Sequence, residues 1–420
     1  MTSERKGLLF CLGCISFIPG IKNRLVNNMS FHPPEIKGYK YSKQYNKVLL
    51  YDHNRSKYVT MSEVMRNMVR LVPGRSQVRV KFMTINSTDV FYYINQASKL
   101  TIIYSHSNAT DIGYLFGHLL DLAYSAGVNI ISYEYSGYGQ SKGEASENSI
   151  YENIDKIFDY SINKLKLNPN SIILYGQSIG SAPTIHLASK YNNMNLGGII
   201  VHSGIKSAVS VICNSKTNVT LPWYDAFKNL DKIQRVKCPV FVIHGTGDTI
   251  IPFNHGEMLY KLAPNKFTPW FVNGANHCNI EVNWRSEFIV RIKKFLMFVS
   301  SNSISSPTSK SPTKDIIDNY DLPTISRVST ISSQGFERID LNDLSDEDDY
   351  DDFEDYIVPN EPVGYDNEER VMDSESNSNY ISDDSDKGIY KKVYFKQIID
   401  KKNEFICYNV NTGINYQLYD

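Results

Sequence analysis

Apolar residues gather in short runs along the middle of the chain, separated by longer stretches of mixed character. The runs are rich in β-branched and aromatic side chains, which is typical of buried strands. Strands that alternate with helical stretches predict an α/β fold, with a mainly parallel sheet covered by helices on both faces. We predict strands over Leu100–Tyr104, Val128–Tyr135, Ser171–Tyr175, Gly198–Val201, Val240–Ile243 and Pro269–Val272, and helices over Asp111–Ala126, Ile150–Leu165 and Pro183–Tyr191.

This alternating pattern has limits at both ends. It begins near Val78, and we predict loop and irregular structure for residues 30–75, so that residues 1–77 wrap the surface of the sheet. It closes with an amphipathic helix over Trp284–Val299, whose apolar side chains recur at helical spacing.

Composition changes abruptly after residue 300, where Ser, Asp, Glu and Asn dominate. The stretch Ser345–Asp355 is mostly acidic, and like charges at that density repel rather than pack. We therefore expect an acidic, disordered tail over residues 299–390. Residues 391–420 regain Tyr, Phe and Ile, and two alternatives stay open for them: docking on the body, or a small hairpin.

The formal net charge of −1 conceals a strong asymmetry. Residues 1–300 hold 33 Lys and Arg against 19 Asp and Glu, a net charge of +14, whereas residues 301–420 come to −15. A basic body with an acidic tail suits an anionic membrane surface, nucleic acid, or a tail that folds back on the body. Two solvated surfaces that meet no partner explain these charges equally well.

An apolar stretch, Gly7–Ile18, stands near the N-terminus and ends at Pro19. A signal peptide has small residues at its cleavage site, but bulky side chains stand at that place here. The stretch is also too short to span a bilayer, and no run of 18 apolar residues occurs in the sequence. We favour a membrane-apposed segment over residues 1–28, S-palmitoylated at Cys11 and Cys14, with a signal peptide as the alternative.

The six cysteines follow no regular framework, and a single pair, Cys11 and Cys14, has CxxC spacing. Without a second such pair the sequence offers no four-thiolate zinc site, so we expect no bound metal. Six unpatterned cysteines in a chain of 420 residues fit a reducing compartment.

The strongest chemical signal is the run Gly176-Gln177-Ser178-Ile179-Gly180. It follows a predicted strand and precedes a predicted helix, which is the context of the nucleophile elbow in an α/β-hydrolase fold. A serine at this sharp turn projects its hydroxyl above the sheet, and flanking glycines let strand and helix approach closely. We predict Ser178 as the nucleophile and the backbone N–H of Ile179 as an oxyanion donor. An accidental turn is the alternative.

A serine hydroxyl needs a neighbouring base, and in this fold the acid and the histidine follow the serine along the chain. His277 stands in a glycine-containing loop after the last predicted strand, which is the expected position of the base. For His186, His202 and His244, which fall in the helix after the elbow or in or just after buried strands, satisfied core histidines are the better interpretation.

Asp248 is the candidate for the acid because it follows the strand Val240–Ile243, in a loop that can turn back toward the histidine. Asp225 and Asp231 compete with it, but they precede that strand and fit better as surface or helix-cap residues.

The second oxyanion donor is expected in the loop Ser105–Asp111, after the first predicted strand of the alternating pattern. The backbone N–H of Asn108 is the first candidate and that of Ser107 the second. Asn108 and Asp111 could instead cap the following helix. Both roles are compatible, because an oxyanion donor of this kind uses only main-chain atoms.

Several motifs together identify a family. The runs Tyr133–Ser141, Tyr175–Gly180 and Ile243–Asp248 closely resemble the α/β-hydrolase domain-containing 17 group, membrane-associated serine hydrolases that remove palmitate from S-acylated proteins. The resemblance covers roughly residues 29–298, which we take as one hydrolase domain. Further matches are Phe31–Pro34, Tyr224–Phe227 and Gly274–Glu281.

The resemblance implies a triad of Ser178, Asp248 and His277, and acylated anchor positions at Cys11 and Cys14. It implies S-acylated membrane proteins as substrates, a peripheral location on the cytoplasmic face of membranes, and chemistry without a cofactor. We expect a monomer that binds no nucleic acid. The enzymatic alternatives are hydrolysis of a lipid monoester or a peptide, and a catalytically weak membrane-bound scaffold is an alternative of another class.

The sequence departs from the family at two positions near the predicted site. His106-Ser107-Asn108 replaces His-Gly-Asn, so a side chain stands where we expect the backbone to need a glycine torsion. Glu134 replaces the family's aspartate. The first departure predicts an altered oxyanion geometry and a lower catalytic rate.

Overall fold

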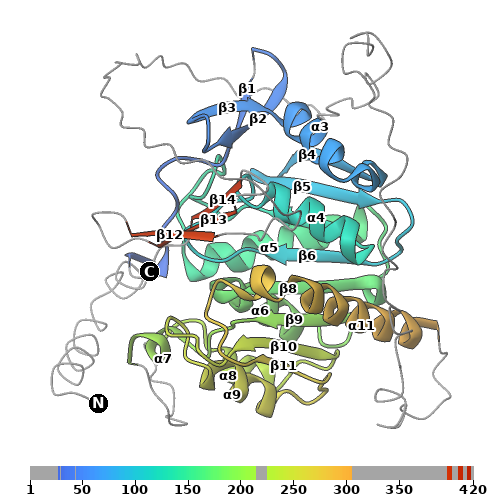
Figure 1. Ribbon diagram of the computed structural model, residues 1–420. Helices are drawn as coiled ribbons and strands as arrows, with labels where there is room; N and C mark the ends of the chain where they lie inside the picture. The colour runs from blue at the N-terminus through green and yellow to red at the C-terminus, as the bar shows by residue number, and fades with distance from the viewer. Residues whose placement is uncertain are drawn as a thin grey trace, which may run out of the picture.

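An eight-stranded sheet forms the centre of the computed structural model (Figure 1), which describes residues 27–28, 30–42, 44–213, 225–304, 395–399, 405–409 and 414–417. The strands of this sheet are β4 (Val78–Ile85), β5 (Thr88–Asn95), β6 (Thr101–Ser105), β7 (Asn129–Tyr133), β8 (Ile172–Gln177), β9 (Gly198–His202), β10 (Val240–Gly245) and β11 (Trp270–Val272). Their order across the sheet is β11-β10-β9-β8-β6-β7-β5-β4.

Six neighbouring strands, from β11 to β7, pair in parallel, and the hairpin β4–β5 adds an antiparallel edge beside β7. Every residue of β6, β7, β8, β9 and β10 is buried. Strands buried along their whole length are typical of a parallel sheet covered on both faces. The predicted α/β-hydrolase fold class with a mainly parallel sheet is therefore confirmed.

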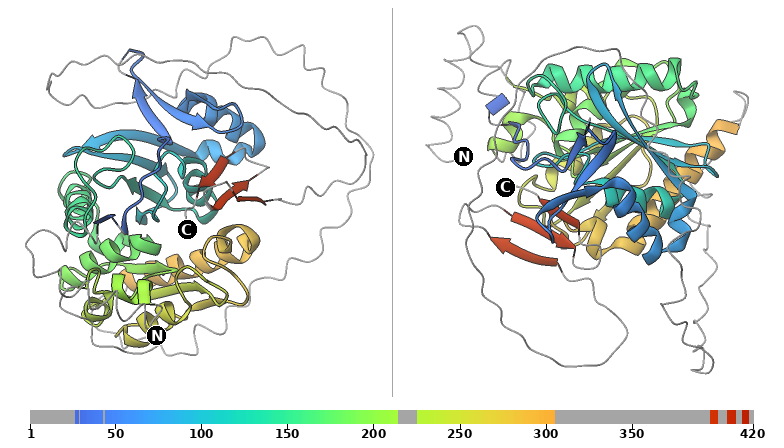
Figure 2. Two further views of the ribbon diagram at one scale, coloured as in Figure 1. Left: turned by 90° about the vertical axis from the view of Figure 1, so that its left-hand side faces the viewer. Right: turned by 90° about the horizontal axis from the view of Figure 1, so that it is seen from above.

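Alternate residues of each strand belong to two separate apolar clusters, one on each face of the sheet. In β8, Ile173 and Tyr175 pack into one cluster, whereas Ile172 and Leu174 pack into the other. The two clusters separate the helices into two layers, seen edge-on in Figure 2 (right). The first face carries α4 (Phe116–Ala126) and α11 (Arg285–Ile304), and the second carries α5 (Glu147–Asn163), α6 (Ser181–Lys190), α8 (Asn229–Ile233) and α9 (Asn254–Leu262).

The predicted strands and helices agree with the observed ones to within a few residues at most ends. The largest shifts are of five residues, at the start of α4, which begins at Phe116 rather than Asp111, and at the end of the last helix, which reaches Ile304 rather than Val299. The Asp111 carboxylate accepts the backbone N–H groups of Gly113 and Tyr114, so the chain first makes a side-chain-supported turn. Short elements complete the body: η2 (Pro169–Ser171), η3 (Ser178–Gly180), α7 (Ala208–Cys213) and α10 (Ile280–Asn283).

The prediction of loop and irregular structure for residues 30–75 was wrong. Helix α3 begins after Thr60, whose side chain accepts the backbone N–H of Glu63, and it buries Met61, Met65 and Met68 on one face. The strands before it are short and half polar, so their periodicity is weak in the sequence. This region contains β1 (Tyr39–Ser42), β2 (Lys47–Asp52), β3 (Lys57–Thr60), α3 (Met61–Leu71) and η1 (Pro73–Gln77).

Helix α11 continues to Ile304, so the predicted start of a disordered tail at residue 299 was wrong; residues 305–394 lie outside the described part of the chain. Near the C-terminus, β12 (Phe395–Ile399), β13 (Phe405–Asn409) and β14 (Ile414–Gln417) form an antiparallel sheet. It is one strand larger than the small hairpin that was one of the two alternatives for residues 391–420. Cys11 and Cys14 also fall outside the described residues. None of the helices that the structure describes is long and apolar enough to cross a membrane.

Candidate active site

Ser178 lies at the sharp turn between β8 and α6. Its φ angle of 53° is in the left-handed region, which costs energy for a residue with a side chain and is typical of a nucleophile elbow. A Cβ atom on Gly176 would collide with the Gly180 carbonyl, and one on Gly180 would collide with the Ser105 carbonyl. Both glycines of the motif are therefore required by close backbone packing, as predicted.

One chain of hydrogen bonds joins Ser178, His277 and Asp248. His277 Nε2 lies 3.0 Å from Ser178 Oγ, and His277 Nδ1 lies 2.8 Å from Asp248 Oδ2. Because Nδ1 faces a carboxylate, it carries the proton, and Nε2 is free to accept from the serine hydroxyl. All three side chains are largely buried. The structure thus brings the three predicted residues together from loops far apart in the sequence.

The Asp248 carboxylate is held in its ionised form by its surroundings. Its Oδ1 atom accepts the backbone N–H groups of Ile250 and Ile251 at 3.0 and 2.8 Å. Burial alone would raise the pKa of Asp248, but hydrogen bonds from His244 and His277 outweigh burial and hold this pKa well below its usual value.

The loops that carry Asp248 and His277 are packed backbone to backbone. The N–H of Gly247 donates to the carbonyl of Ala275 at 2.9 Å, and Gly245 approaches the same carbonyl so closely that a Cβ atom would collide with it. This approach fixes the distance between the acid and the histidine.

The two predicted oxyanion donors belong to two neighbouring segments, the turn after β8 and the loop after β6. Ile179 is in the first turn after Ser178, where backbone N–H groups lack partners within the helix. Asn108 follows β6, the strand next to β8. Its side chain accepts from Tyr138 Oη at 2.6 Å and from the His32 N–H at 3.0 Å. The Asn108 side chain therefore binds the loop to His32 and Tyr138 instead of capping α4.

Comparison with known proteins gives the family. The phospholipase/carboxylesterase family matches residues 133–277. The α/β-hydrolase domain-containing protein aho-3 of Caenorhabditis elegans is 32% identical over 304 residues, which cover 71% of this chain and 86% of that protein. The α/β-hydrolase domain-containing protein 17C of Xenopus tropicalis is 36% identical over 214 residues, 51% of this chain and 67% of its own length. The chain belongs to the α/β-hydrolase domain-containing 17 group.

Membership of this group makes the chain a hydrolase of the esterase, phospholipase and carboxylesterase type. The mouse 17C protein is 38% identical, over 49% of this chain and 62% of its own length. Among solved structures, the Pyrococcus furiosus esterase Pf2001 aligns with 54% of this chain and 92% of its own, at 16% identity and a TM-score of 0.44.

The structure corrects one expectation about the group's His-Gly-Asn loop. Ser107 replaces the glycine of the α/β-hydrolase domain-containing 17 group, but its backbone does not adopt a left-handed conformation. The residue with positive φ in this loop is Ala109, at 54°. A serine at position 107 therefore fits without the expected strain, and the reason for predicting a lower rate disappears.

The two aspartates that competed with Asp248 for the role of the acid lie in different surroundings. Asp225 is buried, contrary to the surface position predicted as one alternative, and its carboxylate accepts the backbone N–H groups of Val209 and Ala226. Asp231 lies exposed in the first turn of α8, as predicted. In place of either of them, the structure brings Asp248 to His277.

The three other candidate histidines are buried or packed, as predicted, but one of them touches the site. His244 Nε2 lies 2.8 Å from the Ile251 carbonyl and 3.3 Å from Asp248 Oδ2. His186 stacks on Tyr151 with ring centroids 4.0 Å apart. His244 lies near the end of β10 and Asp248 in the turn after it, so no spacing rule in the sequence indicates this contact.

A second polar cluster adjoins the His277 loop and was not predicted. The Glu281 carboxylate accepts from Tyr175 Oη at 3.2 Å and lies 3.4 Å from both His118 Nε2 and His202 Nδ1. Burial would raise the pKa of Glu281, but the two histidines outweigh it and hold the pKa well below its usual value. This cluster joins α10, just beyond His277, to the sheet. No metal-binding group of three or more His, Cys, Asp or Glu side chains is found in the described ranges.

Proposed function

We propose that this protein is a serine hydrolase that cleaves acyl thioesters and esters through Ser178, His277 and Asp248, with palmitoylated proteins as its first substrate class. The observation that supports the proposal is the continuous hydrogen-bond chain from Ser178 Oγ through the His277 imidazole to Asp248. This is the arrangement required for general-base activation of a hydroxyl.

In the first step, Ser178 Oγ attacks the acyl carbonyl carbon, and its proton moves 3.0 Å to His277 Nε2. The imidazolium that forms is stabilised by the ionised Asp248 across the 2.8 Å bond to Nδ1. The same bond holds the imidazole in the tautomer that presents a basic Nε2 to the serine.

The tetrahedral intermediate carries a negative charge on the former carbonyl oxygen. We assign the backbone N–H groups of Ile179 and Asn108 as its donors, each worth about 3 kcal/mol in sites of this kind. They are attached to rigid elements, the elbow and the loop after β6, so little reorganisation is needed when the charge develops.

Collapse of the intermediate breaks the bond from the acyl carbon to sulfur or oxygen. His277 gives its proton to the departing thiolate or alkoxide, and an acyl-serine remains. Water then attacks this ester with His277 again as base, and the carboxylic acid leaves as Ser178 recovers its proton. The sequence of steps uses only protein groups and water.

Protein-bound palmitate as substrate is a proposal drawn from the motifs shared with the α/β-hydrolase domain-containing 17 group. A location on the cytoplasmic face of membranes, through acyl chains on Cys11 and Cys14, belongs to the same proposal. A lipid monoester is the second candidate, because the phospholipase/carboxylesterase family matches residues 133–277.

Activity-based labelling tests the nucleophile. A fluorophosphonate probe should label the wild type and not Ser178→Ala, whereas Ser189→Ala, on the helix α6 that follows the elbow, should label normally. Asp248→Asn should turn over a short acyl thioester about ten-thousand-fold more slowly, because the amide favours the wrong imidazole tautomer. Equal labelling of wild type and Ser178→Ala would refute the assignment.

Substrate class is tested with the same purified protein on two substrates, an S-palmitoylated protein and a lysophospholipid. Faster Ser178-dependent release of palmitate from the protein supports thioesterase activity. Faster release of the fatty acid from the lipid supports the second candidate. If the protein hydrolyses neither of these substrates and no short acyl ester, the result supports a scaffold.

A further inference from the structure

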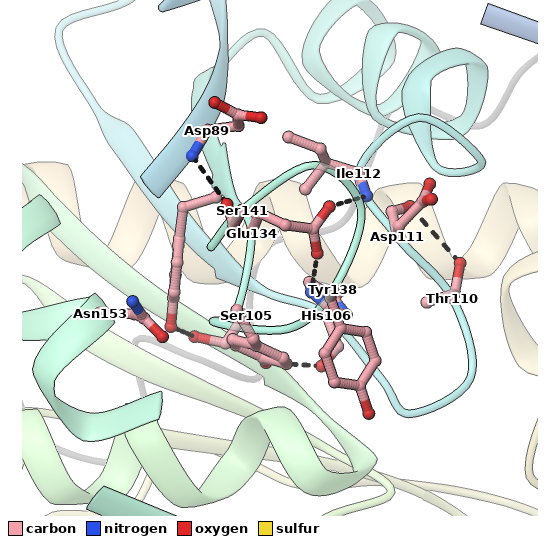
Figure 3. A network of polar contacts seen from close by, with 12 residues as sticks. Asp89, Ser105, His106, Thr110, Asp111, Ile112, Glu134, Tyr138, Ser141 and Asn153 are labelled. Carbon is pink, nitrogen blue, oxygen red and sulfur yellow. Dashed lines mark hydrogen bonds and ion pairs between the residues drawn. The ribbon is translucent and has the colours of Figure 1, made fainter. Parts of the chain in front are cut away.

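Five buried titratable side chains lie in or next to the loop that carries Asn108, and the proposed proton transfers use none of them. We call residues Ser105–Asp111 the oxyanion loop. Figure 3 shows most of this cluster and its dashed contacts. The five side chains are those of Tyr39, Asp89, His106, Asp111 and Glu134.

Glu134 joins the two ends of the oxyanion loop. Its Oε1 atom lies 3.0 Å from His106 Nε2, and its Oε2 atom accepts the backbone N–H of Ile112 at 3.3 Å. Both side chains of the ion pair have no exposed surface. One carboxyl group thus contacts residue 106 at the start of the loop and residue 112 just after its end (Figure 3).

The other ring nitrogen of His106 has a partner within the oxyanion loop. His106 Nδ1 lies 2.8 Å from the Ser107 carbonyl, which can only accept, so Nδ1 carries hydrogen. The imidazole is therefore held between the Ser107 carbonyl and the Glu134 carboxyl group.

His106 in turn contacts the elbow. Its ring stacks on Tyr135 with centroids 3.9 Å apart, and Tyr135 Oη donates to the His106 carbonyl at 2.7 Å. The carbonyls of Ser105 and His106 face Gly180, where a Cβ atom would collide with them. The backbone of the oxyanion loop is therefore pressed against the turn that carries Ser178.

The other acidic groups that face this pair have partners of their own. Asp111 accepts the backbone N–H groups of Gly38, Gly113 and Tyr114, and Asp89 accepts from the hydroxyls of Tyr39 and Thr84. Burial, and next the charge of Glu134, raise the pKa of Asp111 to about 7. The phenols of Tyr135 and Tyr138 complete the surroundings, with ring centroids 3.9 and 5.5 Å from that of His106.

We propose that Glu134 is a positioning residue of the hydrolase site, which holds the oxyanion loop against the Ser178 elbow through His106 at one end and Ile112 at the other. The inference rests on the proposed serine-hydrolase function. It assigns to the cluster a role in the transition state, where the Asn108 N–H must meet the developing oxyanion. A role confined to folding would leave kcat unchanged in variants that stay folded.

Two substitutions of Glu134 distinguish the effect of its polar contacts from the effect of the space that its side chain fills. In Glu134→Gln, the amide oxygen can accept from Ile112 and the amide N–H can donate to a neutral His106, so both contacts survive. Glu134→Leu fills similar space but keeps neither. With a short acyl thioester, we expect Glu134→Leu to lower kcat about 10- to 100-fold with KM changed less than about threefold, and Glu134→Gln to stay within about threefold of wild type.

Tyr135→Phe provides a second test of the inference in case Glu134→Leu does not fold. It deletes the single oxygen atom that donates to the His106 carbonyl, and we expect kcat to fall about fivefold, which corresponds to one lost hydrogen bond. Asp121→Asn is the control. Asp121 lies on α4, beyond the oxyanion loop, and forms half-buried ion pairs with Arg75 of η1 and Arg285 of α11. The substitution should lower the melting temperature and leave kcat within about twofold.

The outcomes divide cleanly. Unchanged kcat in folded Glu134→Leu or Tyr135→Phe would overturn the inference, as would a loss in Glu134→Gln as large as that in Glu134→Leu. Absence of Ser178-dependent turnover by the wild type would overturn the proposed function and this inference together. Normal wild-type turnover with unaffected variants would overturn the inference alone.

Discussion

His244 lies 3.3 Å from Asp248 Oδ2, the same carboxylate oxygen that binds His277 at 2.8 Å. The two histidines thus approach one atom from different sides, and both help to keep that carboxylate ionised. The contact gives a core histidine a direct influence on the acid of the site, although it touches neither the serine nor the base.

Replacement of His244 should weaken catalysis without abolishing it. His244→Leu removes one hydrogen-bond donor to Asp248, so we expect kcat for a short acyl thioester to fall about fivefold, the equivalent of about 1 kcal/mol. His244→Gln keeps an N–H donor and should lose less. His186→Leu, which removes a packed histidine away from the triad, is the control. An unaffected kcat in His244→Leu would show that the contact is only structural.

His255 should make the protein sensitive to acid. Burial, and next the charge of Lys206, lower the pKa of His255 to about 3, and its Nδ1 accepts the backbone N–H of Lys206. A folded pKa below the unfolded value means that the stabilising contribution is complete above pH 6.5 and is lost as the pH falls toward 3.

We expect the wild type to lose about 2 kcal/mol more free energy of unfolding than His255→Gln between pH 7 and pH 4.5, because protonation of His255 then favours the unfolded chain. Urea denaturation at the two pH values measures this difference. Parallel losses in the two proteins would mean that His255 already carries a proton when folded at pH 4.5.

The segment before β1 should support activity up to a definable residue. The Ser30 carbonyl and the His32 N–H bind the Asn108 side chain, and Phe31 packs edge-on against Tyr138 and Phe227. Deletion of residues 1–26 leaves all these contacts, so kcat should stay close to the full-length value. Deletion of residues 1–32 removes them and should lower kcat about tenfold. Equal activity of the two truncated proteins would exclude any support of Asn108 by this segment.

Membrane attachment should depend on the two N-terminal cysteines in a graded way. One acyl chain holds a protein only marginally, so Cys11→Ser should lower the membrane-bound fraction and Cys11→Ser with Cys14→Ser should largely abolish it. Cys238→Ser, at a half-buried cysteine of the body, is the matched control. Fractionation of cells that express each variant measures the effect. A fully membrane-bound double variant would contradict acylation as the anchor.

The sequence identifies the parts of the site that depend on local structure. Ser178 is recognised because a strand, a glycine-flanked turn and a helix follow one another, and Asp248 and His277 are recognised because each follows a later strand. These residues obey rules of spacing and order, which a single sequence displays.

Contacts between distant segments are harder to predict. Nothing in the spacing of Glu134 and His106 indicates that they form a buried ion pair, because the contact depends on the pairing of β6 with β7 and on the turns that follow these strands. The burial of Asp225 depends in the same way on Val209, which lies 16 residues away. The left-handed conformation in this loop falls on Ala109 and not on Ser107, and the residue types alone do not indicate which of the two adopts it.

The attachment of Asn108 to Ser30 also sets a length scale for the proposed membrane-bound enzyme. Ser30 lies 16 positions after Cys14 in the sequence, and a fully extended chain of that length reaches about 55 Å. An acyl chain on Cys14 would therefore hold the reacting serine within a fixed radius of the bilayer surface. Thioesters on juxtamembrane cysteines fall inside this radius, whereas acyl groups carried far out into the cytosol on an extended domain fall beyond it.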